Sequence, residues 1–206
     1  MFSLLLRGFA LGFAVAASPG PIFFLCLRRT LLRGRLYGLV SGLGVATADG
    51  FYAALATFGV AALSVALVSG RRPLALIGGA ALAALGLRIL LEAPRAPAPA
   101  APPTARSLAG AYLSTLGLTI TNPATIISFV ALAATLGLGA GGGLGRPALV
   151  VAGVLFGSAM WWVVLAIAVS LLRSRMTPGV VRGISVFSGL AIILLGALAI
   201  YSAVAT

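Results

Sequence analysis

The stretch AVAASPGPIFFLCLRR, residues 14–29, decides how the chain folds. Apolar residues lead up to Ser18, a Ser-Pro-Gly-Pro sequence follows, and apolar residues resume after Pro21. Proline removes a helical hydrogen bond, and its ring clashes with the preceding turn. Because the flanking residues are as apolar as those of a membrane helix, the pattern predicts a membrane span that is interrupted in its middle.

Composition places the whole chain in a membrane. Of its 206 residues 61% are hydrophobic and 8% are charged, whereas a soluble domain carries about 25% charged residues. The apolar runs are long and continuous, which predicts helices and not the short alternating segments of a β-barrel. The net charge of +12 comes from arginines in short clusters between these runs. We interpret these clusters as topology signals and expect no nucleic-acid partner.

Six apolar segments are long enough to cross a bilayer. They cover residues 2–27, 37–69, 73–91, 108–136, 148–172 and 184–204. Ten of the fourteen arginines fall on one side of this arrangement. That excess predicts a cytoplasmic location for this side and places both termini outside.

The chain divides into two halves of three spans each. A Pro- and Ala-rich segment, residues 92–107, predicts an extended cytoplasmic linker between a first repeat, residues 1–91, and a second repeat, residues 108–206. The second half is interrupted at TNPA, residues 121–124, in its first span, as the first half is at SPGP. Inverted repeats with paired breaks are typical of secondary transporters. We therefore predict an all-α polytopic membrane protein of six transmembrane helices, built as two inverted three-helix repeats with broken helices in spans 1 and 4.

The two breaks predict a binding site for an anionic group. Serine and asparagine are strong N-caps, and proline is favoured at the first helical position, so Ser18-Pro19 and Asn122-Pro123 each predict a helix that starts inside the membrane. Helix starts present free N–H groups and a partial positive charge. The alternative is that the prolines only bend the two helices. The predicted site residues at the breaks are Ser18, Pro19, Gly20, Pro21, Thr121, Asn122 and Pro123, with Thr119 as a further hydroxyl.

Asp49 is the only acidic residue inside a predicted span. A charge at this depth costs about 3 kcal/mol, so such residues usually face a polar cavity and serve function. Three roles stay open for Asp49: exchange of a coupling proton, pairing with a substrate ammonium group, or a structural ion pair, for which Arg88 is the nearest candidate. Trp161 and Trp162 lie mid-span, where they either line the substrate path or pack in the core. With no histidine and one cysteine in the chain, we expect no metal site, no cofactor and no enzymatic activity.

Taken together, these residues resemble the LysE/RhtB family of bacterial amino-acid exporters, the LysE-type translocators. The resemblance rests on the PGP of residues 19–21, on RGRLYGLVSGLG at 33–44, on Asp49, and on LTITNPATIISFVALAATLG at 118–137. It implies a secondary transporter of the bacterial cytoplasmic membrane that exports amino acids or related small metabolites with the proton gradient as driving force. Ile22 stands where many relatives carry a polar or acidic residue, which argues against a strongly cationic substrate.

Two other functions stay open. One is export of a cation or heavy metal by a transporter of the same superfamily, although soft metals favour Cys and His ligands. The other is a membrane scaffold that transports nothing, for which Asp49 and the breaks would be dispensable. The expected partners are an amino-acid substrate and the lipid bilayer, and assembly of identical copies is left open.

Overall fold

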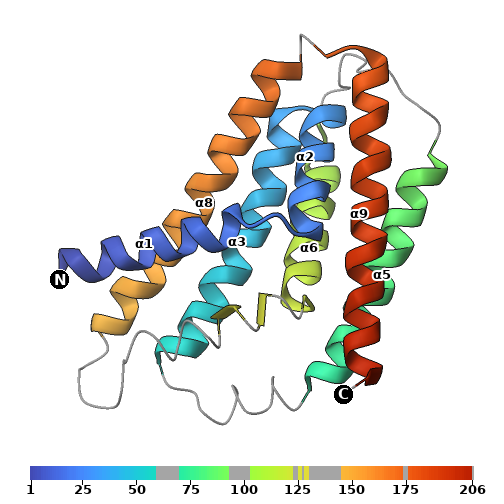
Figure 1. Cartoon of the computed structure of the whole chain (residues 1–206). Helices are drawn as coiled ribbons and strands as arrows, with labels where there is room; N and C mark the ends of the chain where they lie inside the picture. The colour runs from blue at the N-terminus through green and yellow to red at the C-terminus, as the bar shows by residue number, and fades with distance from the viewer. Residues whose placement is uncertain are drawn as a thin grey trace.

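The computed structural model describes residues 1–58, 70–92, 103–122, 125–126, 128–129, 145–173 and 176–205. All regular secondary structure in these residues is helical (Figure 1). The helices are α1 (Phe2–Ala17), α2 (Pro21–Arg33), α3 (Arg35–Thr57), α5 (Arg71–Leu91), α6 (Ala105–Ile120), α8 (Gly145–Arg173) and α9 (Pro178–Ala205). Alanine and leucine dominate them, and both are among the best helix formers.

Four of these helices, namely α3, α5, α8 and α9, are each long and apolar enough to cross a membrane. The helices α1 and α2 pass the same test only as a pair, bent by 77° at the Ser-Pro-Gly-Pro break. The described part of the fourth predicted span consists of α6 and a few residues after it. Residues 59–69 of the second span, 93–102 of the linker and 130–136 of the fourth span lie outside the described residues.

Two sequence predictions of loops are wrong. The arginines from Arg28 to Arg33 belong to α2, which ends only at Gly34, whose φ of 91° suits glycine. The predicted linker also ends early, because α6 begins at Ala105. There the Thr104 hydroxyl accepts a hydrogen bond from the Ser107 N–H, and the Ser107 hydroxyl accepts one from the Thr104 N–H. This capping box starts the helix three residues before the predicted boundary.

Helices of the first half pack mainly against helices of the second half. The helix α8 contacts α1 and α3, α3 also contacts α6, and α5 pairs with α9. The short helix α2 lies between α3 and α9 (Figure 1). Helix α2 is therefore largely enclosed, and Arg33 is the only one of its residues that is exposed.

Glycines allow the closest of these approaches. At the crossing of α5 and α9, a Cβ added to Gly79 would lie 2.7 Å from the Gly196 carbonyl oxygen, and a Cβ added to Gly196 would lie 2.7 Å from the Gly79 oxygen. About two turns along, a Cβ added to Gly86 would lie 2.7 Å from the Gly189 carbonyl oxygen. Such close backbone contact is the usual means of joining helices where lipid removes the hydrophobic driving force.

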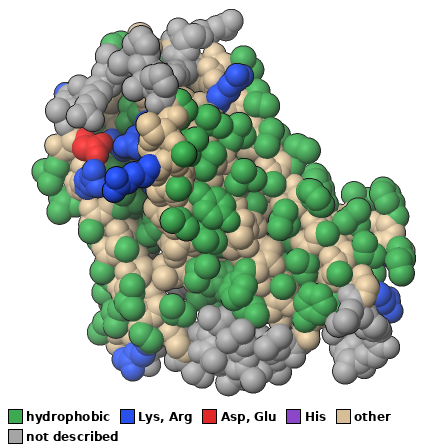
Figure 2. Space-filling model, turned by 180° about the vertical axis from the view of Figure 1, so that it is seen from behind, with side chains coloured by type: hydrophobic (Ala, Val, Ile, Leu, Met, Phe, Trp, Pro, Cys, Tyr) green, Lys and Arg blue, Asp and Glu red, His purple; other side chains and the backbone are tan. Residues whose placement is uncertain are grey.

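Apolar side chains cover the middle of the surface. Figure 2 shows hydrophobic side chains across most of one face, with the arginines and one acidic group near its edges. Exposed residues such as Phe156, Ile167 and Leu194 belong to this outer surface. A protein in water rarely exposes apolar area on this scale, so the surface fits a lipid environment.

Candidate functional site

The first break is built by two residues that each precede a proline. A residue before proline is pushed into extended backbone, and Ser18 (φ −65°, ψ 125°) and Gly20 (φ −137°, ψ −179°) both adopt it. The two extended residues separate α1 from α2 and turn the chain between them. The sequence thus correctly predicted an interruption at this point, and the chain does more than bend.

The capping residue at this break differs from the predicted one. Ser18 ends α1, and its hydroxyl donates back to the Ala14 carbonyl at 3.3 Å. Helix α2 begins two residues later, with Gly20 as its N-cap and Pro21, not Pro19, at the first helical position. The second proline starts the helix because Gly20, which precedes it, is still held in extended backbone.

The start of α2 offers free backbone donors. In the first turn of a helix the N–H groups have no partner within the helix, and Pro21 has no N–H at all. The first helical bond runs from the Phe24 N–H to the Gly20 carbonyl at 3.3 Å. The N–H groups of Ile22 and Phe23 therefore have no partner inside α2. No acidic side chain occupies this first turn.

The second break lies at the end of α6. This helix stops at Ile120, whose carbonyl accepts a hydrogen bond from the Tyr52 hydroxyl. The N–H groups of Thr125 and Ile126 both donate to the Asn122 carbonyl, at 3.1 and 3.2 Å, so a new turn begins at Asn122. Pro123, the predicted first residue of the new helix, lies outside the described residues.

Asp49 is buried on α3, with 2% of its surface exposed. The Ser158 hydroxyl of α8 donates to its carboxylate at 2.7 Å. The predicted alternative of an ion pair with Arg88 is wrong, because Arg88 is exposed at the end of α5 and pairs with Glu92 at 3.5 Å. A hydroxyl therefore binds the Asp49 carboxyl group, which has no cationic partner in the described part of the chain.

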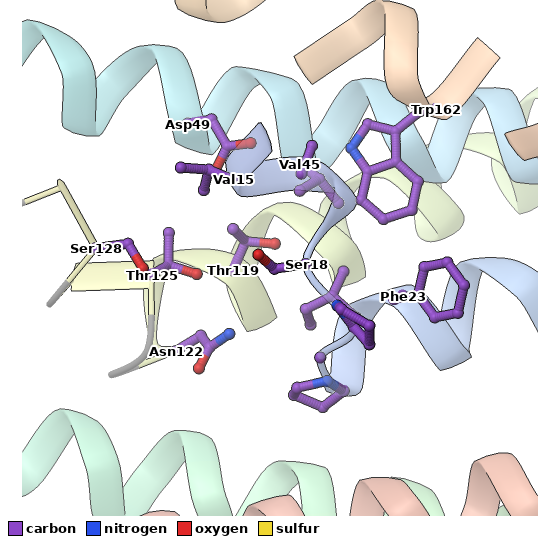
Figure 3. A pocket seen from close by; sticks show the side chains of 15 residues that line it. Val15, Ser18, Phe23, Val45, Asp49, Thr119, Asn122, Thr125, Ser128 and Trp162 are labelled. Atoms are coloured by element: carbon purple, nitrogen blue, oxygen red, sulfur yellow. The ribbon is translucent and has the colours of Figure 1, made fainter. Parts of the chain in front are cut away.

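The first break, the end of α6 and Asp49 meet at one cavity of about 130 Å³ (Figure 3). Figure 3 shows Ser18 and Thr119 close together in its middle, with Asp49 above and Asn122 below. The walls combine apolar side chains with hydroxyls, an amide and the single carboxylate. The lining residues are Val15, Ala16, Ser18, Pro19, Gly20, Pro21, Ile22, Phe23, Val45, Asp49, Thr119, Asn122, Thr125, Ser128 and Trp162.

Most of the residues predicted at the breaks line this cavity, but Thr121 does not. Its hydroxyl donates to the Gly117 carbonyl at 2.9 Å, and its backbone packs on Gly78 of α5. Thr119 lies two positions earlier, on the other side of α6, and does line the cavity. The sequence analysis did not identify Thr125, Ser128 or Ser158. The spacing of four between Ser158 and Trp162, which puts both on one face of α8, was the available signal.

Arginines surround the other end of α2. The Arg29 guanidinium donates to the Ser41 hydroxyl at 3.0 Å, to the Ala111 carbonyl at 3.0 Å and to the Ser114 hydroxyl at 2.9 Å. Arg28 pairs with Glu92 at 2.5 Å. Burial alone would raise the pKa of Glu92, but the Arg28 hydrogen bond and the nearby arginine charges outweigh burial, so its pKa lies below the usual value. These contacts tie α2 to α3, α5 and α6.

Comparison with known proteins identifies a family. The family model for LysE type translocators matches residues 13–203, which is most of the chain. No curated protein and no solved structure matches it.

Proposed function

Because the chain belongs to the LysE type translocator family, we propose that it exports amino acids or related small metabolites as a secondary transporter driven by the proton gradient. The family and the apolar helices make it a multi-pass membrane transporter. The bacterial cytoplasmic membrane, with both termini outside, is the location that fits the arginine distribution. One observation carries the substrate proposal: the first break, the end of α6 and Asp49 converge on one cavity.

The proposed architecture is a pair of inverted three-helix repeats. Its first repeat contains α1 with α2, α3 and α5, and its second begins with α6 and ends with α8 and α9. Three features support it: α3 packs on α8, α5 packs on α9, and α1 on α8 has its counterpart in α6 on α3. The reciprocal contact of Gly79 with Gly196 is also what a two-fold relation between α5 and α9 would produce.

An amino-acid zwitterion fits the charges of the cavity. The N–H groups of Ile22 and Phe23 and the positive end of α2 suit a carboxylate. Asp49 and the Thr119 hydroxyl suit an ammonium group, because they supply a negative charge and an acceptor. The first repeat would then hold the carboxylate through α2, and both repeats would hold the ammonium group, through Asp49 on α3 and Thr119 on α6.

Asp49 is the proposed site of proton coupling. A buried carboxylate is costly unless something balances its charge. A substrate ammonium group balances the charge while the cavity is filled, and a proton balances it when the substrate has left. Alternation of the two on one carboxyl would couple proton entry to export of the substrate.

Efflux from loaded cells tests this proposal. Cells take up a panel of dipeptides, intracellular hydrolysis releases the amino acids, and their appearance outside is measured for the wild type and for Asp49→Asn. We expect Asp49→Asn to retain the amino acids that the wild type exports. Glu92→Gln is the matched control, since it removes the chain's other acidic residue, which lies outside the cavity.

The same assay separates the alternatives. If Asp49→Asn exported amino acids at the wild-type rate, the coupling role of Asp49 would be wrong. If the wild type exported cadmium and none of the amino acids, the substrate class would be wrong. If neither were exported and cells tolerated changes at Asp49 and at both breaks, a scaffold would be the better explanation.

A further inference from the structure

Trp162 carries a buried hydrogen-bond donor that the fold leaves unused. Its side chain is 3% exposed and lines the cavity. Its indole nitrogen has no hydrogen-bond partner among the described residues. In Figure 3 this nitrogen lies on the edge of the ring that is turned toward Asp49. A buried donor without an acceptor costs about 1–3 kcal/mol, so its position calls for an explanation.

Packing fixes the position of the indole ring. A Cβ added to Gly42 of α3 would lie 2.5 Å from the Trp162 Cγ, so only glycine lets the ring lie against α3. Ser158, one turn earlier on the same face of α8, already donates to Asp49. The ring therefore cannot move closer to α3 to find an acceptor. The Asp49 carboxylate already accepts a hydrogen bond from the Ser158 hydroxyl.

We propose that the Trp162 indole N–H, with the N–H groups of Ile22 and Phe23, holds the substrate's carboxylate, and that the cavity selects short neutral amino acids. This rests on the proposed export function and adds its specificity. The indole N–H donates only and accepts nothing, so it matches a carboxylate oxygen and offers nothing to an ammonium group. Three neutral donors bind an anion without a cationic side chain in the cavity.

The size of the cavity restricts the substrate further. Its volume is about 130 Å³, and a protein cavity of about 150 Å³ accepts benzene. Alanine has the same number of non-hydrogen atoms as benzene. Apolar residues such as Val15 and Val45 on the wall suit a methyl side chain, whereas the described lining offers no second carboxylate for the side-chain charge of lysine or arginine.

A spectroscopic titration tests the proposed carboxylate-binding site without requiring transport. The chain has two tryptophans, so the full-length protein in detergent micelles, labelled with ¹⁵N, gives two indole signals that Trp161→Phe and Trp162→Phe assign. L-alanine and propionate should each move the Trp162 proton signal downfield, and ethylamine, which lacks a carboxylate, should not. If neither carboxylate moved the Trp162 signal, the proposed carboxylate-binding site would be refuted.

Transport kinetics test the consequence. Trp162→Phe keeps the ring that packs on Gly42 and removes the N–H, and we expect it to raise KM for alanine about tenfold, which corresponds to about 1.4 kcal/mol. KM for alaninamide, which lacks the carboxylate, should hardly change. Trp161→Phe is the matched control, because its indole nitrogen is also buried without a described partner but lies outside the cavity lining.

The outcomes of the two experiments separate the two proposals. Equal KM values for alanine in Trp162→Phe and Trp161→Phe would overturn the role of the indole and leave the export function standing. A downfield shift of the Trp162 signal in a protein that exports no amino acid would support the carboxylate-binding site and refute the export function.

Discussion

The crossing of α5 and α9 gives a prediction whose size follows from the structure. In Gly79→Ala the new Cβ would lie 2.7 Å from the Gly196 carbonyl oxygen, whereas ordinary contact begins at 3.4 Å. The Ile200 side chain, also 2.7 Å away, could rotate, but the carbonyl oxygen is backbone, so the two helices have to separate by about 0.7 Å at this point. Overpacking of this kind costs about 1–3 kcal/mol of stability.

A control on the partner helix α9 isolates this cost. Alanine is a better helix former than glycine by about 1 kcal/mol, which offsets part of the loss in Gly79→Ala. Gly183 lies on α9, and a Cβ there would meet nothing within 4 Å, so Gly183→Ala reports the propensity gain alone. We expect the free energy of unfolding of Gly79→Ala to lie about 1–3 kcal/mol below that of Gly183→Ala.

Because the contact is reciprocal, a second variant and the double variant have expected results as well. Gly196→Ala should be destabilising for the same reason as Gly79→Ala. The double variant should lose less than the sum of the two, because helices already separated by one methyl group have room for the other. Unfolding in micelles with a rising fraction of denaturing detergent, followed by circular dichroism, gives these free energies. Strict additivity, or a Gly79→Ala protein as stable as Gly183→Ala, would refute the described crossing.

Two further predictions concern the arginine end of α2. Arg29→Lys should lower the free energy of unfolding by about 1–3 kcal/mol, because an ammonium group cannot make the three forked hydrogen bonds to Ser41, Ala111 and Ser114. The control is Arg33→Lys, which should lower it less, because the Arg33 guanidinium lies over the Tyr37 ring and not in this network. Equal losses in the two variants would contradict the role of the network. The pKa of Glu92 is lower in the folded protein than its usual value of 4.5, so the Arg28–Glu92 pair stabilises the fold at neutral pH and loses this effect as pH falls through the lowered pKa. Acid titration of unfolding should show this loss in the wild type and not in Glu92→Gln, with an amplitude below about 1 kcal/mol because Glu92 is partly exposed, and identical profiles would contradict it.

The sequence predicted the interruption of the first span because prolines restrict the backbone locally. The predicted start at Pro19 was wrong, although the same local restriction decides it: Gly20 precedes Pro21 and is held in extended backbone, so the helix begins at Pro21. Thr119 and Thr121 illustrate a related limit: successive helical residues turn by about 100°, so residues two apart face nearly opposite sides. Which of the two faces the cavity is set by the packing of α6 on α3 and α5.

Asp49 was identified as a functional candidate by its cost in a membrane, which is a property of the residue alone. Its partner was not, because Ser158 is 109 residues away and a helical serine carries no signal of its own. The Arg88 alternative failed for a geometric reason. Arg88 is the last-turn residue of α5, four positions before Glu92, and its side chain extends outward to that acid.

The two ends of α2 explain why its start can act on an anion. A helix dipole is weakened when acidic side chains lie at its positive end, and α2 has none in its first turn, while Arg33 compensates its negative end. Arg28 and Arg29 lie in the second half of the helix, about 10–12 Å from its start, where Glu92, Ser41 and Ser114 hold them. The helix is about 20 Å long at 13 residues, so Arg33 is the charge farthest from the cavity. The positive end is thus left to the cavity, where the nearest described acid, Asp49, is engaged by Ser158 on a different helix.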